Sequence, residues 1–109
     1  MNREQIIARL LKLPGAIYDA EMAIYDALMV VCEAKEFLAT KEANLYTEGK
    51  IDGKNAEIRG GQLRQLTIIE RNHVATAENS LNQARNTFNH LHNEFKMLQT
   101  VAYLIEGVE

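Results

Sequence analysis

The chain has 109 residues, of which 47% are hydrophobic and 25% charged, and its net charge at pH 7 is -3. This length suits one small domain with a moderate core, over residues 1–109. The slightly acidic balance disfavours non-specific nucleic-acid binding, which needs a broad cationic field. A single proline, no tryptophan and an abundance of Ala, Leu, Glu, Asn and Gln predict an all-α fold.

The N-terminal residues and the cysteine indicate the compartment. Residues 2–4 are polar or charged, no cleavable apolar segment follows them, and no window reaches the roughly 18 apolar residues that cross a bilayer. Cys32 stands alone, so no intrachain disulfide can form, and we expect it to be a small buried hydrophobe. We therefore expect a cytoplasmic protein without membrane contact.

A short first helix is predicted over about residues 2–12. Asn2 is a good N-cap, and Gln5 is placed to reach back to it in a capping box. Pro14 has no amide proton and disfavours helical angles at Leu13, so the helix should end before it. Pro14 also suits the first turn of the next helix.

A second helix is predicted over about residues 14–48. Its apolar positions recur at alternating steps of three and four, which gives one seam to cover. The seam is Ile17, Ala20, Ile24, Ala27, Val31, Ala34, Leu38, Lys41 and Leu45, with one charged member. A second apolar face on this helix, formed by Tyr18, Met22, Tyr25 and Met29, is a candidate interface for another subunit or another protein.

The connection to the third helix is read from its glycines and its acidic cap. Gly49 suits the left-handed position after a helix, and Asp52 suits an N-cap for a helix that starts at residue 53. Gly60–Gly61 would cost that helix about 2 kcal/mol relative to two alanines. The alternative is a longer connection, with the helix starting after Gly61.

The third helix, predicted over about residues 53–106, carries the longest seam. The seam is Val74, Ala77, Leu81, Ala84, Phe88, Leu91, Phe95, Leu98, Ala102 and Ile105. We predict an antiparallel coiled-coil hairpin, with a turn near residue 51 that sets Leu38 opposite Leu63 or Arg64. The short first helix either extends the arm, with Ile6 to Leu13 opposite Phe88 to Leu98, or folds back into a three-helix bundle.

Chemistry-bearing groups are sparse. His90 and Glu94 share a helix face, but no third ligand completes a metal site, and no nucleophile–base pair or phosphate-binding loop is present. We therefore expect no catalytic residue, no cofactor-binding residue, no metal ligand and no enzyme activity. Asparagines recur every seven residues away from the seam and form a candidate contact face: Asn72, Asn79, Asn86 and Asn93.

The segment from Glu48 to Arg59, with its acidic-glycine and Asp-Gly-Lys-Asn-Ala-Glu sequence, resembles the hairpin region of small uncharacterised helical coiled-coil proteins of phages and prophages. The resemblance covers about 15 residues. It implies two coiled-coil helices joined at this segment, often encoded near replication or recombination genes, and it carries no assigned functional residue. Where such proteins commonly carry Lys-Ala, this chain has Gly60–Gly61.

These observations predict a non-enzymatic helical module for protein interaction or assembly, phage-derived, that forms a homo-oligomer (a dimer) or binds another helical protein. The alternative function is that of a nucleic-acid-associated accessory protein of a phage replication or recombination system, which would use Arg64, Arg71, Arg85 and the asparagine face.

Overall fold

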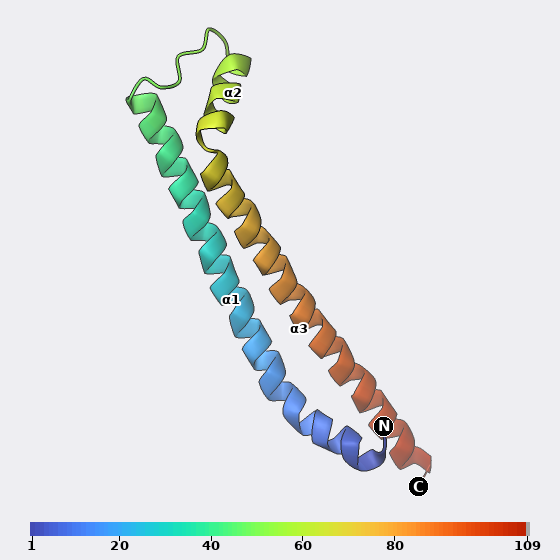
Figure 1. Ribbon diagram of the computed structural model, residues 1–109. Coiled ribbons are helices and arrows are strands. Elements are labelled where there is room, and N and C mark those ends of the chain that lie inside the picture. The colour runs from blue at the N-terminus through green and yellow to red at the C-terminus, as the bar shows by residue number, and fades with distance from the viewer. Residues whose placement is uncertain (109) are drawn as a thin grey trace. The chain divides into compact units, whose positions relative to one another are not determined.

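Three helices make up the computed structural model, which describes residues 1–108, the side chain of residue 108 excepted (Figure 1). The helices are α1 (Arg3–Thr47), α2 (Ala56–Leu66) and α3 (Ile68–Val108). The long helices α1 and α3 pack against each other, so the predicted all-α helical hairpin is confirmed. No helix within this range is long and apolar enough to traverse a bilayer.

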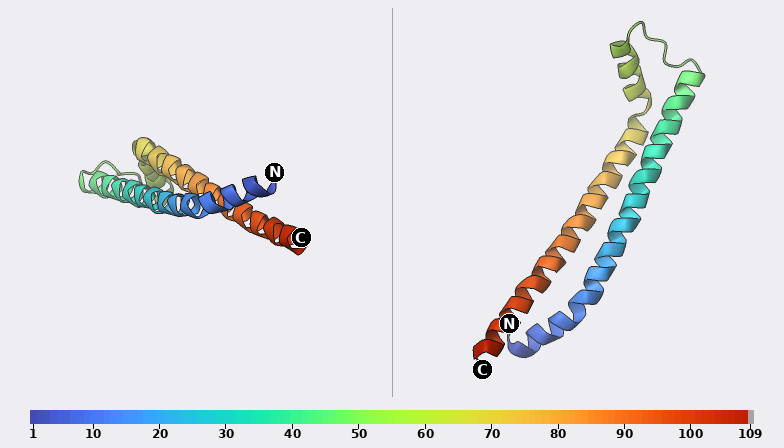
Figure 2. Two further views of the ribbon diagram at one scale, coloured as in Figure 1. Left: turned by 90° about the horizontal axis from the view of Figure 1, so that it is seen from below. Right: turned by 180° about the vertical axis from the view of Figure 1, so that it is seen from behind.

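The chain divides into two compact units. The terminal unit contains Met1–Asp26 and Asn82–Glu109, and the turn unit contains Ala27–Leu81. In the terminal unit the start of α1 packs against the second half of α3, and Figure 2 shows the two chain ends at the same end of this unit. In the turn unit the rest of α1 packs against the start of α3, with α2 between them in the sequence.

The N-terminus of α1 is capped as predicted. The backbone N–H of Asn2 donates to Gln5 Oε1, and the N–H of Gln5 donates to Asn2 Oδ1, both at 2.9 Å. This reciprocal pair satisfies two amide groups that have no partner inside the helix.

The prediction that the first helix ends before Pro14 is wrong, because α1 continues through this residue. Pro14 removes one helical hydrogen bond, at a cost of about 3 kcal/mol. Leu13 and Ile6 are buried beside Leu98 of α3, and burying each such side chain gains about 1.5–3 kcal/mol. Continuing the helix therefore outweighs the lost bond, and Figure 1 shows α1 bending in this N-terminal part.

The first residues of α1 thus extend the arm along α3, and the fold-back into a three-helix bundle is not found. The core of the terminal unit is Ile6, Leu13 and Leu98, with partly buried neighbours that include Leu10, Leu91 and Phe95. These are the segments that the sequence places opposite each other.

The seams predicted on both long helices are confirmed. All ten seam residues of α3 are buried or half-buried, and so are all those of α1 except Lys41, the charged member. Cys32, in contrast, is exposed, and its predicted burial is wrong. It follows the buried Val31 on the helix, and successive helical residues point about 100° apart, so its side chain leaves the seam.

The end of α1 follows the predicted turn chemistry. Gly49 has φ of +73°, and the N–H of Lys50 donates to the carbonyl of Leu45 at 2.9 Å, as in a Schellman cap. The next helix starts at Ala56, however, and not at residue 53. Asn55 is its cap and accepts from the N–H of Ile58, at 2.9 Å.

Asp52 stabilises the connecting loop and does not cap the helix. Its carboxylate accepts a hydrogen bond from Gln62 Nε2 at 2.8 Å, and its backbone N–H donates to Gln62 Oε1 at 3.2 Å. The N–H of Gly53 donates to the same oxygen, at 2.9 Å. The loop therefore lies along α2.

Gly60–Gly61 does not interrupt the helix, in agreement with the alternative of a helix that runs through the two glycines, and neither alternative foresaw a break at Thr67. Both glycines lie inside α2, and the interruption falls at Thr67, with φ of -119° and ψ of 23°. Thr67 is fully buried, and its hydroxyl donates to the carbonyl of Leu63 at 2.6 Å. Because of this bond, the buried Thr67 hydroxyl is not left unpaired at the junction of α2 and α3.

The helix register of the turn unit differs from the prediction, whereas the Arg9–Glu94 contact of the terminal unit agrees with it. Glu42 contacts Arg71 and Lys35 contacts Glu78, so the facing part of α3 comes about three turns later than a turn near residue 51 implies. Only five residues of α1 follow Glu42. Helix α1 therefore reaches the C-terminal end of α2, while the loop covers its N-terminal part, as Figure 1 shows.

Candidate interaction surface

The face predicted from Tyr18, Met22, Tyr25 and Met29 is exposed on α1. In the terminal unit Tyr18, Met22 and Tyr25 are 61%, 42% and 56% exposed, and Met29 in the turn unit is 62% exposed. Their four-three-four spacing sets them off the seam, so packing against α3 leaves them in solvent. Large apolar side chains clustered on one helix are typical of a contact surface.

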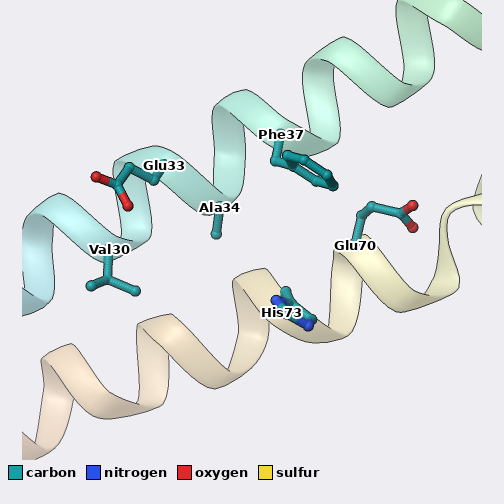
Figure 3. A pocket seen from close by; sticks show the side chains of 6 residues that line it. All are labelled: Val30, Glu33, Ala34, Phe37, Glu70 and His73. Atoms are coloured by element: carbon teal, nitrogen blue, oxygen red, sulfur yellow. The ribbon is translucent and has the colours of Figure 1, made fainter.

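A groove between α1 and α3 lies in the turn unit, and the sequence did not predict it. Its volume is about 320 Å³. Figure 3 shows Val30, Ala34 and Phe37 supplied by α1, and His73 and Glu70 by α3 on the facing side, with Glu33 near the α1 rim. Phe37 is 70% exposed, which leaves an aromatic ring uncovered.

The groove continues along α3. A second hollow of about 240 Å³ shares Val30 and His73 with the first and extends to Thr76, Ala77 and Ser80. From Glu70 to Ser80 the helix rises about 15 Å. An open, elongated trough of this kind suits a helix better than a compact small molecule, which needs an enclosed cavity.

The rim of the groove carries unpaired negative charge. Within residues 1–108, Glu33 and Glu70 form no ion pair and no side-chain hydrogen bond. The nearby cations are already engaged, because Lys35 contacts Glu78 at 3.5 Å and Arg71 contacts Glu42 at 3.4 Å. The groove therefore presents an apolar floor with two carboxylates that are free to accept a cationic partner.

The asparagines predicted as a contact face are exposed at each position of α3 that was named: Asn72 and Asn79 in the turn unit, and Asn86 and Asn93 in the terminal unit. Throughout the described part of the chain these four amides have no side-chain hydrogen-bond partner. Of the arginines assigned to nucleic-acid binding, Arg64 and Arg85 are exposed, whereas Arg71 pairs with Glu42.

Near His90 in the sequence, Glu94 of α3 forms an ion pair with Arg9 of α1. Arg9 donates to both carboxylate oxygens of Glu94, each at 2.8 Å, and this hydrogen bonding lowers the pKa of Glu94. The Glu94 carboxylate is thus occupied by a guanidinium. Within residues 1–108, no three side chains of His, Cys, Asp or Glu lie together in a way that could hold a metal ion.

The sequence analysis did not predict the Arg9–Glu94 pair or the groove of the turn unit, and only the pair left a recognisable pattern in the sequence. The Arg9–Glu94 pair flanks the seams at positions of the terminal unit that the predicted register already sets opposite each other, so charge complementarity could have found it. The groove had no such signal, because Phe37 and Val30 lie beside the seam and look like ordinary surface positions. Comparison of the chain with protein-family models, curated proteins and solved structures gave no match in any of the three.

Proposed function

We propose that this chain is a non-enzymatic helical interaction module that assembles with a second copy of itself and presents a further helical surface to another protein. The observation that carries the proposal is the amount of apolar side chain left uncovered beside the seams. Tyr18 and Tyr25 of the terminal unit and Phe37 of the turn unit are each more than half exposed. Exposed clusters of this size favour protein contact.

The cellular setting belongs to the same proposal. The resemblance of residues 48–59 to phage and prophage helical proteins supports a phage-derived accessory role in the cytoplasm. A role in nucleic-acid binding has weaker support, because Arg71 is neutralised by Glu42 and the net charge is -3. A phosphate-binding surface needs several free cations on one side.

The test is the molar mass in solution, measured by light scattering after size-exclusion chromatography and by sedimentation velocity at micromolar concentrations. We expect about twice the 12.3 kDa of one chain. A monomer at every concentration would contradict self-assembly. In a parallel titration with single-stranded and duplex DNA at about 50 mM salt, where phosphate-driven affinity is high, we expect no binding. Binding there would favour the accessory role on nucleic acid.

A further inference from the structure

Helix α2 has little tertiary support. It has 11 residues, none of them buried, and contains Gly60 and Gly61. Isolated helices this short are marginal in water, and the two glycines lower the helix propensity further. Its hydrogen bonds to the loop use Arg59 and Gln62, which leaves another side of the helix uncovered.

The uncovered side has a distinct form and charge. Gly60, Gly61 and Arg64 lie three and four residues apart and share this side. A Cβ built on either glycine meets nothing within 4 Å, so no packing inside the chain requires a glycine there. Arg64 is exposed and, among the residues that the structure describes, has no ion-pair partner. The side is therefore a shallow notch with a free cation at its edge.

The groove of the turn unit complements this notch. Its projecting Phe37 ring fits a notch without side chains, and its free carboxylates, Glu33 and Glu70, match the free guanidinium of Arg64. The lengths also agree, since α2 is about 16 Å long and the groove follows α3 for about 15 Å.

We propose that α2 of one copy docks into the turn-unit groove of a second copy, and that the second copy returns the same contact. Both surfaces belong to the turn unit, so one twofold axis can make the exchange reciprocal, and the assembly closes as a dimer. Each copy then covers α2 of the other copy, the helix with little tertiary support in its own chain. This inference rests on the proposed self-assembly and specifies its surfaces, and the α1 residues Tyr18, Met22 and Tyr25 stay available to another protein.

The first test uses Gly60→Leu and Phe37→Asp in the full-length chain. A side chain at position 60 meets open space, and leucine is a better helix former than glycine. Gly60→Leu should therefore keep or raise helicity and thermal stability at high dilution. The same side chain fills the notch, so the dimer dissociation constant should rise at least about tenfold. Phe37→Asp should weaken the dimer similarly without unfolding the chain, because the ring is exposed. Leu11→Asp, at a residue that is 78% exposed in the terminal unit, is the matched control and should leave the dimer unchanged.

The second test reverses the charges. Arg64→Glu and Glu33→Arg should each weaken the dimer, and the double variant should recover most of the lost affinity, because the pair is restored between copies. Circular dichroism checks that every variant stays helical. Two results would overturn the docking: a dimer that is unaffected by all groove and α2 variants, or one that only Tyr25→Glu dissociates. In both cases self-assembly stands and its surface lies elsewhere, whereas a monomeric wild type removes both proposals.

Discussion

Arg9 and Glu94 join the start of α1 to the second half of α3 through two parallel hydrogen bonds of 2.8 Å each. The Arg9 side chain is 36% exposed and that of Glu94 is 22% exposed, so the pair lies at the edge of the core formed by Ile6, Leu13 and Leu98. A bidentate guanidinium–carboxylate contact fixes both the distance and the relative orientation of the two side chains. It therefore helps to set the register in the terminal unit.

The first prediction concerns the pH dependence of this pair. Hydrogen bonding from Arg9 lowers the pKa of Glu94 below its ordinary value of 4.5, despite partial burial, which opposes the shift. The folded state thus binds the proton less tightly than the unfolded state. The stabilisation is complete above the unfolded pKa and is lost as the pH falls from about 4.5 through the lowered value.

We expect Glu94→Gln to lower the urea midpoint at pH 7 and to flatten its dependence on pH in the acid range. Urea unfolding followed by circular dichroism from pH 7 to pH 3 measures both effects. Glu78→Gln is the matched control, because the contact of Glu78 with Lys35 is longer, at 3.5 Å, and about half exposed. Equal changes in the two variants would show that the Arg9 contact has no special role.

The second prediction concerns Leu13, the residue that holds α1 against α3 beside Pro14. Leu13 is fully buried, so Leu13→Ala should lower the free energy of unfolding by about 2–5 kcal/mol. Leu11→Ala makes the same chemical change at an exposed position and should stay within about 0.5 kcal/mol of the wild type. Chemical unfolding of the two variants side by side makes the comparison, and a small loss for both would contradict the role of Leu13.

The sequence pattern predicted which side of each long helix is covered. Heptad spacing depends on helix geometry alone, so Leu81 and Leu98 of α3, and Val31 of α1, could be assigned to the interior without knowledge of their partners. The capping box at Asn2 and the positive φ at Gly49 were predictable for the same reason, because each depends on residues within one turn.

Features that depend on contacts between distant residues were not predictable in this way. The effect of Pro14 on α1 is decided by the burial of Leu13, which is a tertiary gain and cannot be read from the proline itself. The register of the turn unit depended on where α2 begins, and Asp52 and Asn55 are equally good caps in sequence. The groove around Phe37 followed only once the register was known, because it is built from both helices.

The third prediction concerns Thr67, which separates α2 from α3. Its hydroxyl donates to the Leu63 carbonyl at 2.6 Å and accepts a hydrogen bond from Arg71 Nε at 2.9 Å, and Arg71 in turn contacts Glu42 of α1. Thr67→Val keeps the shape of the side chain but removes both bonds. Because the site is fully buried, the free energy of unfolding should fall by about 1–3 kcal/mol.

Thr87→Val is the matched control for Thr67→Val. Thr87 makes the same type of bond, from its hydroxyl to the carbonyl of Gln83 four residues earlier at 3.1 Å, but it is exposed on α3 and no arginine donates to it. Water replaces the lost bond there, so we expect a change within about 0.5 kcal/mol. Urea unfolding of both variants measures the difference. If Thr67→Val is as mild as Thr87→Val, the hydroxyl does not hold the junction of α2 with α3, and the packing of the Thr67 methyl group alone maintains it.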